Sequence, residues 1–198
     1  IAKVFHNKVQ NFSTIIAKNY LEHFGPTFLF ISGDPIGRQN IPGFGVIYIF
    51  EVVLLPLGLI YAIGDKRFSK SKIILLWLVV APVASAVTFQ TPNALRAENM
   101  SVPLAIVSAF GACLLIERLV KKNAYLKYTL LSISCVVVVY FFTAMLHQYY
   151  THIPKRYALE WEYGFGEMLS FVAKEQNQYS KIIITDRYDQ PYILTLFY

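Results

Sequence analysis

Four apolar stretches, separated by short polar connections, dominate the sequence. An α-helix crosses a bilayer core of ~30 Å with ~20 apolar residues. Stretches close to this length lie at residues 41–63, 73–89, 101–116 and 126–146. Pro82 interrupts the second stretch, whereas Pro103 falls in the first turn of the third, where proline is tolerated. The pattern predicts a transmembrane domain of four helices over residues 41–147.

The residues before this domain predict a surface helix followed by a loop. Residues 1–18 repeat apolar positions with helical spacing among lysines, which is typical of an amphipathic helix on a membrane interface or on the protein surface. Residues 19–45 concentrate turn residues, with Gly25-Pro26 and the Gly-Asp-Pro turn at 33–35. We expect this segment to be an extracytoplasmic loop.

The C-terminal segment, residues 148–198, is more polar. Residues 162–176 place apolar side chains on one helical face, 181–185 (KIIIT) predict a buried strand, and 190–198 predict a second apolar helix. The fold class expected is therefore an all-α polytopic membrane protein with the start of a small extracytoplasmic α/β domain. Because the chain begins at Ile1 and stops in an apolar run, we expect a piece of a longer protein.

The basic residues predict the orientation in the membrane. The connection after the first stretch holds Lys66, Arg67, Lys70 and Lys72, and the one after the third holds Arg118, Lys121, Lys122 and Lys127. The connection between the second and third stretches holds only Arg96. Since Lys and Arg mark the cytoplasmic side, residues 19–45, 88–100 and 148–198 are expected outside. The protein is then an integral protein of the cytoplasmic (plasma) membrane.

Composition agrees with a membrane protein and argues against nucleic acid. The chain is 56% hydrophobic and 15% charged, whereas soluble domains carry roughly a quarter charged residues. The net charge of +6 comes from short clusters between apolar runs and not from a basic stripe. Cys113 and Cys135 lie inside apolar runs and are interpreted as packing residues. No motif for a metal or cofactor is present, which leaves a requirement for a divalent metal ion open.

Three groups of polar side chains are expected on the outer face. They are His23, Asp34, Arg38 and Asn40; then Gln90, Asn93, Arg96, Glu98 and Asn99; then His152, Lys155, Arg156, Glu160 and Glu162. Guanidinium groups bind phosphate through two parallel hydrogen bonds, and apolar helices can hold a lipid tail. The residues alone indicate a membrane enzyme or transporter for an anionic, lipid-like substrate.

Each of these residues also has a structural interpretation. Arg96 either binds substrate or pairs with Glu98 or reaches lipid head groups, and Arg38 has the same alternatives. Asp34 is equally explained as a turn residue. Glu51 is placed about two turns into the first span, where a carboxylate is a functional candidate or the partner of a basic residue. His23 and His152 have no spaced partners, which argues against a metal site.

Several stretches resemble a known family. YLEHFGPTFLFISGDPIGRQNIPGFGVIYIFE and TPNALRAENMSVPLAI are similar to the later half of bacterial glycosyltransferases related to the dolichyl-phosphate-mannose protein mannosyltransferases (family 39-like, the GT-C membrane class). The tail EWEYGFGEMLSFVAKEQNQYSKIIITDRYDQPYILTLFY resembles the beginning of their extracytoplasmic domain. The resemblance covers nearly the whole chain.

This resemblance implies an inverting enzyme that transfers a sugar from a polyprenyl-phosphate carrier to an acceptor outside the cytoplasm. The acceptor, a protein, lipid or glycan, stays open, and the expected general-base aspartate would precede Ile1. Relatives often show Pro-His-Ala-Leu-Arg where this chain has residues 92–96, so Asn93 departs from the pattern and Arg96 keeps its register. The expected substrate-binding set is Arg96, Arg38, Asp34, Asn93, His23 and Glu51.

Two other functions remain alternatives. A transporter or flippase for a lipid-linked sugar would share the spans, the outer basic residues and Glu51, but would show inverted hydropathy repeats in the complete protein. A membrane scaffold without catalytic activity would tolerate loss of charge at Arg38 and Arg96.

Overall fold

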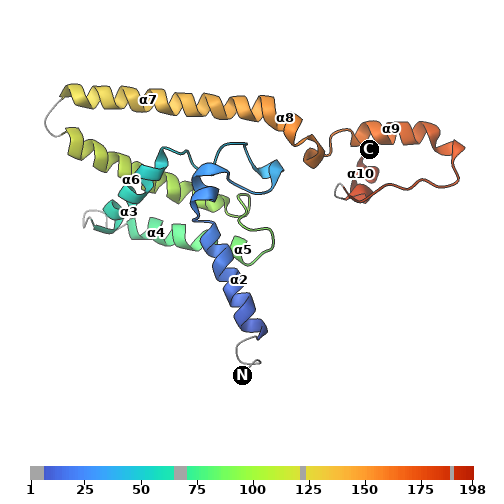
Figure 1. Ribbon diagram of the computed structural model, residues 1–198, viewed down its shortest axis with the longest axis horizontal. Coiled ribbons are helices and arrows are strands. Elements are labelled where there is room, and N and C mark those ends of the chain that lie inside the picture. The colour runs from blue at the N-terminus through green and yellow to red at the C-terminus, as the bar shows by residue number, and fades with distance from the viewer. Residues whose placement is uncertain (1–6, 65–70, 121–123, 188–189) are drawn as a thin grey trace.

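The computed structural model describes residues 7–64, 71–120, 124–187 and 190–198, and these residues are all-α (Figure 1). The principal helices are α2 (Lys8–Glu22), α3 (Glu51–Gly64), α4 (Ser71–Val80), α5 (Val83–Ala86), α6 (Ser101–Val120), α7 (Ala124–His147), α8 (Ile153–Arg156), α9 (Phe165–Glu175) and α10 (Pro191–Phe197). Short helical turns join them: η1 (Thr27–Ile31), η2 (Gly37–Gln39), η4 (Glu98–Met100), η5 (Gln148–His152), η6 (Ala158–Trp161) and η7 (Gln176–Gln178).

Two helices in the described residues are long and apolar enough to cross a membrane. One comprises η4 with α6, Glu98–Leu119, and the other joins α7, η5 and α8 as Tyr125–Arg156. The other two predicted spans are shorter, at Glu51–Gly64 and Lys72–Ala86. The first begins at Glu51 and not at residue 41, because residues 41–50 form turns before the helix.

Helices α3 and α6 cross at two glycines. A Cβ on Gly58 would lie 1.8 Å from the carbonyl oxygen of Val107, and one on Gly111 would lie 1.9 Å from that of Leu54. The two backbones therefore touch, and any larger side chain at either position would separate the helices. Close approach at small residues is the usual way in which helices associate in a membrane, where burial of apolar surface gives little driving force.

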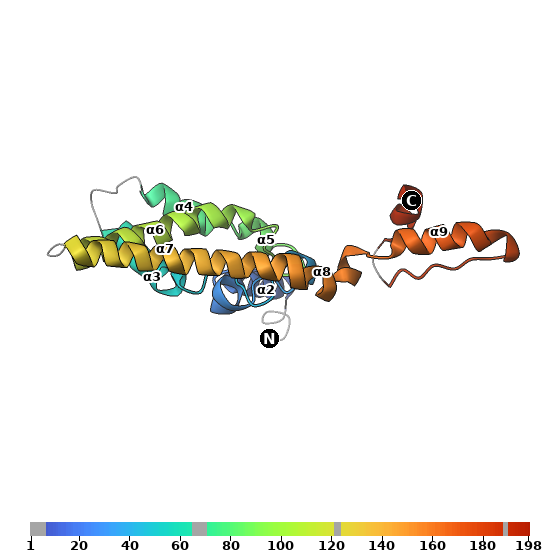
Figure 2. The same cartoon turned by 90° about the horizontal axis from the view of Figure 1, so that it is seen from above.

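Helix α7 lies along this pair but buries little of itself (Figures 1 and 2). None of the residues in its most apolar window is buried, whereas 39% of those in the corresponding window of α6 are buried. Its best-defined contact is aromatic, between Phe141 and the rings of Tyr48 and Phe50, with centroid distances of 6.0 and 5.5 Å. The rest of its apolar surface is left for lipid or for further protein.

The helices define two ends of the bundle. The C-terminal ends of α3 and α6 and the N-terminal ends of α4 and α7 lie at one end, at the left in Figure 1. The predicted cytoplasmic residues Lys66, Arg67, Lys70, Lys121 and Lys122 lie outside the described residues. The opposite end carries the segments 23–50, 88–100 and 148–163 and is called the loop end below. It corresponds to the face that the sequence predicts to be extracytoplasmic.

A small core anchors the loop end. Phe28 and Leu29 from η1 pack with Met100 at the end of η4 and Leu104 in the first turn of α6, and each is at most 3% exposed. The segment before α3 is fixed to η1 by backbone hydrogen bonds, such as that from Ile47 N to the Leu29 carbonyl at 2.9 Å. This packing holds the loops that carry most of the predicted site residues.

The predicted α/β arrangement of the C-terminal segment is wrong. Helices α9 and α10 are present where helices were expected, but residues 181–185 form no strand and are extended without ladder hydrogen bonds. Ile183 is 80% exposed. A strand needs neighbouring strands for its backbone groups, and the described residues supply none. The apolar run KIIIT therefore has strand composition without a sheet to join.

The predicted N-terminal helix is present as α2. It begins at Lys8 because the Asn7 side chain accepts a hydrogen bond from Gln10 N at 2.7 Å and so caps its first turn. Residues 1–6 lie outside the described residues. Most of α2 projects from the bundle, and only its C-terminal end docks at the loop end (Figure 1).

Candidate functional site

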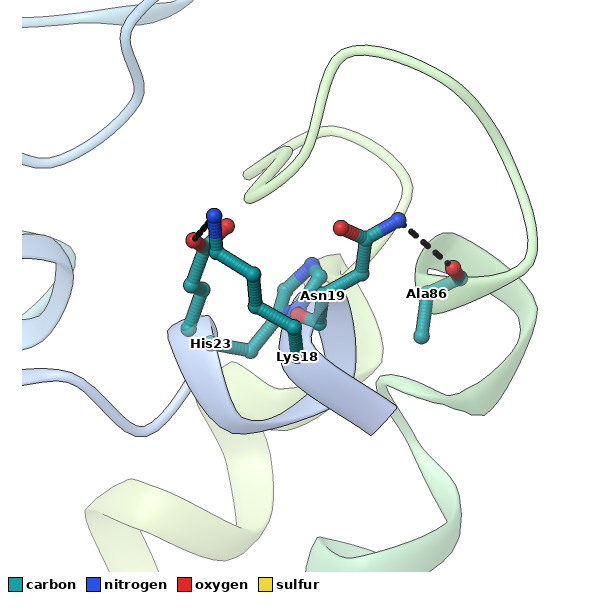
Figure 3. A network of polar contacts seen from close by, with 5 residues as sticks. Lys18, Asn19, His23 and Ala86 are labelled. Carbon is teal, nitrogen blue, oxygen red and sulfur yellow. Dashed lines mark hydrogen bonds and ion pairs between the residues drawn. The ribbon is translucent and has the colours of Figure 1, made fainter. Parts of the chain in front are cut away.

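The end of α2 docks onto α4 and α5 through polar contacts. Figure 3 shows Asn19 reaching across to α5, where its Nδ2 donates to the Ala86 carbonyl at 3.2 Å. The Tyr20 hydroxyl donates to the Val79 carbonyl of α4 at 2.8 Å. The Lys18–Glu22 ion pair, at 3.8 Å, lies on the exposed side of α2, where such pairs contribute little. These contacts bring the last residue of this turn, His23, against α5.

His23 is completely buried and its two ring nitrogens have opposite roles. Nδ1 lies 2.8 Å from the Asn19 carbonyl, which can only accept, so Nδ1 carries the proton. Nε2 therefore accepts, from the Ser85 hydroxyl at 2.8 Å and from Asn93 N at 3.3 Å. Burial lowers the pKa of His23 below its usual value, while the Asn19 carbonyl and the charges of Glu22 and Asp34 act in the opposite direction. A neutral imidazole is what this geometry requires.

Asp34 joins the first loop to the second. Its side chain is 1% exposed, Oδ1 accepts from Ile36 N at 2.7 Å, and Oδ2 accepts from Ala94 N. The first bond is the local turn that the Gly-Asp-Pro sequence predicts. The second is a contact across 60 residues, which sequence reasoning did not identify.

Asn93 links the buried groups to Arg96. Its backbone N–H donates to His23, and its side-chain Oδ1 accepts from Arg96 N at 2.9 Å. The Arg96 Nη1 donates to the Phe89 carbonyl at 2.6 Å and to the Thr88 hydroxyl at 2.9 Å, and its guanidinium lies 5.3 Å from the centroid of the Phe89 ring. The other guanidinium nitrogens make no hydrogen bond within the described part of the chain. The exposed Arg96 side chain is thus held in place through Nη1, while its other guanidinium N–H groups can still donate to a ligand.

His23, Asp34, Ser85 and Asn93 are together called the buried polar cluster. All four are at most 1% exposed, and each has the hydrogen bonds described above. Three of the predicted substrate-binding residues therefore come together, but they bond to protein groups. Their geometry fixes the loops around residues 34 and 93 and offers no surface to a substrate.

Glu51 is a helix cap and not a carboxylate in mid-membrane. It lies in the first turn of α3, and its Oε1 accepts from Tyr48 N at 3.2 Å while its own N–H donates to the Tyr48 carbonyl at 2.9 Å. The bond from Tyr48 N to the Glu51 side chain is one half of a capping box, and a backbone bond takes the place of the other half. A negative charge is also favourable at this end of the helix dipole, so the position of Glu51 has a structural explanation.

Arg38 lies at a cleft of about 550 Å³, called the aromatic cleft. Residues from two segments form its walls: Arg38, Gln39, Asn40 and Ile41 on one side, and Tyr149, Tyr150, Ile153, Pro154, Ala158, Trp161 and Tyr163 on the other. Arg38 N donates to Glu160 Oε2 at 2.8 Å, which fixes the two walls together. Gly37 permits the approach, because a Cβ there would lie 2.4 Å from the Tyr157 ring.

The aromatic cleft holds two amide oxygens without partners. Gln39 Oε1 and Asn40 Oδ1 are buried and have no hydrogen bond within the described residues. An unsatisfied buried acceptor costs ~1–3 kcal/mol. Both oxygens are shielded from solvent, so a ligand in the cleft would reach them only after the two side chains rotate.

A second cleft of about 530 Å³, called the basic cleft, opens on the same segments. Pro42, Gly43, Gln148, His152, Lys155 and Arg156 line it. The Arg156 guanidinium lies 5.7 Å from the centroid of the Tyr157 ring. Within the described residues no carboxylate pairs with Lys155 or Arg156. The cleft thus presents two uncompensated positive charges.

Sequence reasoning missed two parts of this region. Ser85 was counted inside an apolar span. The signal was Pro82, because the helix is interrupted there and Ser85 lies in the next short helix. The aromatic residues 149, 150, 161 and 163 were not recognised as one wall, because the bend after α8 that brings them together leaves no periodic signal. No group of three or more His, Cys, Asp or Glu side chains in the described residues could hold a metal ion.

Comparisons of the chain with protein families, with curated proteins and with solved structures gave no match. The resemblance to membrane glycosyltransferases therefore stays a prediction, and the functional argument rests on the geometry of the two clefts.

Proposed function

We propose that this chain is part of a membrane glycosyltransferase that moves a sugar from a polyprenyl-phosphate carrier to an acceptor on the extracytoplasmic face. The aromatic cleft is the observation that supports this function best. It combines exposed ring surfaces, the amide residues Gln39 and Asn40, and the cation Arg38 at the end of a long apolar helix. A sugar attached to a lipid phosphate needs these three kinds of contact.

The sugar itself fits the aromatic wall. Tyr150, Trp161 and Tyr163 are 72%, 62% and 77% exposed, so their rings are available for stacking. Aromatic rings offer a broad apolar face with a polar edge, which matches the C–H face of a sugar ring. Rotation of the Gln39 and Asn40 side chains toward the cleft would bring their amide groups to the sugar hydroxyls.

The lipid phosphate requires positive charge near this wall. Arg38 lies in the lining of the cleft, and Arg96 is exposed at the same end of the bundle with guanidinium donors beyond those that bond Thr88 and Phe89. In a transfer reaction the carrier phosphate is the leaving group, so these cations would stabilise its developing charge. The exposed apolar surface of α7 would receive the polyprenyl chain.

A transfer assay on the full-length protein in membranes tests this proposal. Radiolabelled polyprenyl-phosphate sugar is supplied, and transfer by wild type is compared with that of Trp161→Ala and Arg96→Ala. Loss of a stacking ring should lower kcat/KM about tenfold, and loss of a charge-stabilising donor should lower it about 100-fold. Trp77→Ala, which changes the other tryptophan of the chain on α4, is the matched control and should transfer normally.

The outcomes separate the three functions considered. Normal transfer by Trp161→Ala would remove the aromatic cleft from the site. Transport of the labelled carrier across the bilayer without any transfer by wild type would favour the transporter. If wild type shows neither activity, the scaffold becomes the better account.

A further inference from the structure

The basic cleft has a composition that the proposed transfer reaction does not use. His152, Lys155 and Arg156 are exposed and line one wall, and no carboxylate within the described residues neutralises the two cations. Lys155 and Arg156 differ from the isolated exposed lysines of the chain because they share one concave site with His152. The positive charge of this cleft would be complemented by an anion.

The position of the cleft relative to the bilayer core indicates which kind of anion it could bind. The continuous helix Tyr125–Arg156 has 32 residues, or ~48 Å at 1.5 Å per residue, and so exceeds a hydrocarbon core of ~30 Å. Counting ~20 residues from Lys127, its first charged residue, places the far boundary of that core near His147. With a typical tilt of ~20°, His152 to Arg156 lie ~7–13 Å beyond this boundary. This is the level of lipid phosphates, and the long Lys155 and Arg156 side chains reach across it.

Two residues with small or no side chains form the other wall of the cleft. Pro42 and Gly43 contribute no charge, and nothing lies within 4 Å of the position that a Cβ on Gly43 would take. The cleft, at about 530 Å³, has room for a bulky head group and not only for a small ion. The apolar and exposed α7 continues directly below it, with Val138, Val139 and Phe142 about half or more exposed, where acyl chains would lie.

We propose that the basic cleft binds the phosphate and head group of an anionic phospholipid of the surrounding leaflet through Lys155, Arg156 and His152. This site is separate from the proposed sugar site and does not rest on transferase activity. Binding would fix the register of the long helix α7–α8 at the membrane surface, and with it the position of η5 and η6, which form the wall of the neighbouring aromatic cleft.

A lipid-binding measurement on the full-length protein tests the proposal. The protein is purified in neutral detergent and titrated with fluorescent phosphatidylglycerol, with fluorescent phosphatidylcholine as the neutral probe. Each cation near a lipid surface contributes about a fivefold gain in affinity, so Lys155→Gln/Arg156→Gln should bind phosphatidylglycerol about 25-fold more weakly. Lys174→Gln/Lys181→Gln removes the same charge from the exposed tail and should bind like wild type.

Two further arms separate the remaining explanations. The charge-conserving variant Lys155→Arg/Arg156→Lys should keep most of the affinity, which shows that a loss in the Gln variant does not come from misfolding. Equal binding of phosphatidylglycerol by the Gln variant and by wild type would overturn the proposal. Displacement of the labelled lipid by inorganic phosphate at comparable concentration would also overturn it, because the site would then recognise free phosphate and not a lipid.

Discussion

The loop end contains two polar regions that differ in exposure and in hydrogen bonding. In the buried polar cluster, four side chains are at most 1% exposed, and their hydrogen bonds go to protein groups. In the two clefts, Arg38, His152, Lys155 and Arg156 are exposed, and two amide oxygens have no partner within the described residues. The sequence gives no sign of this difference, because both regions consist of similar residues between apolar runs.

This difference indicates that the buried polar cluster stabilises the fold and that the clefts bind ligands. A buried polar group is costly unless its hydrogen bonds are made, so the cluster around His23 can persist only in one arrangement of the loops. The exposed cations of the clefts carry no such constraint, since water satisfies them in the absence of a ligand. The cluster is therefore expected to respond to substitution with a loss of stability, and the clefts with a loss of binding.

The largest loss of stability is expected for Asp34→Ala. The substitution removes both acceptors from the partly buried N–H groups of Ile36 and Ala94, and the free energy of unfolding should fall by about 3 kcal/mol. A denaturant titration of the full-length protein in detergent micelles measures it. Asp186→Ala, in the exposed tail, is the matched control and should change little. An equal, small effect of both substitutions would mean that the cluster is not structural.

A smaller and pH-dependent loss is expected at His23. The pKa of His23 in the folded state lies below its usual value, so the unfolded chain binds the proton more readily. The stability that neutral His23 contributes is therefore complete above about pH 6.5 and decreases as pH falls through the folded pKa. Protonated Nε2 can no longer accept from Ser85 and Asn93, at a cost of about 2 kcal/mol for the two bonds.

Thermal unfolding between about pH 7.5 and pH 5 measures this effect, since the range includes the usual pKa of histidine near 6.5. Wild type should lose stability toward acid pH, and His23→Asn should start lower and vary less. His147→Gln, which changes an exposed histidine at the end of α7, should keep the pH dependence of wild type. A pH dependence that survives in His23→Asn would assign it to another group.

The effect of Arg96→Ala on stability is expected to lie between the effects expected for the buried polar cluster and for the clefts. Its Nη1 hydrogen bonds to Thr88 and Phe89 are exposed, so the unfolding free energy should fall by only about 1 kcal/mol. Transfer activity should fall far more, as proposed above. The ratio of the two effects, measured on one preparation, is informative: a loss of stability as large as that of Asp34→Ala would place Arg96 with the buried cluster.

The smallest effect on stability is expected for Trp161→Ala. The indole is 62% exposed, so truncation should change the unfolding free energy by less than ~0.5 kcal/mol while it weakens sugar binding. The same titration that serves Asp34→Ala checks this. A large destabilisation would show that the aromatic wall is a packing surface.

The sequence predicted the helices better than their roles. Apolar runs of sufficient length located α6 and α7, because helical hydropathy is a local property. The same hydropathy pattern misplaced the start of the first span, since the turns at residues 41–50 are as apolar as the helix that follows. It predicted a strand at residues 181–185 from β-branched composition, but a strand depends on partners that composition does not reveal.

The candidate site was harder to predict, because it depends on contacts between distant segments. His23, Asp34 and Asn93 were identified as residues that converge, and they do, but only the bonds to Ser85 and Ala94 show that they are turned inward. Glu51 was interpreted as an intramembrane carboxylate, whereas its position relative to Tyr48 makes it a cap. The aromatic cleft required the bend after α8, which no pattern in the sequence indicates.

The lengths of the helices have a consequence for biosynthesis. Helix α4 has ten residues, or ~15 Å, and cannot by itself cross a hydrocarbon core of ~30 Å, whereas the helix containing α7 can. Helix α4 leaves the ribosome before α6, against which it packs, so its packing surface stays uncovered until α6 has been synthesised. The loop end is completed later still, because its segment 148–163 follows α7 in the chain.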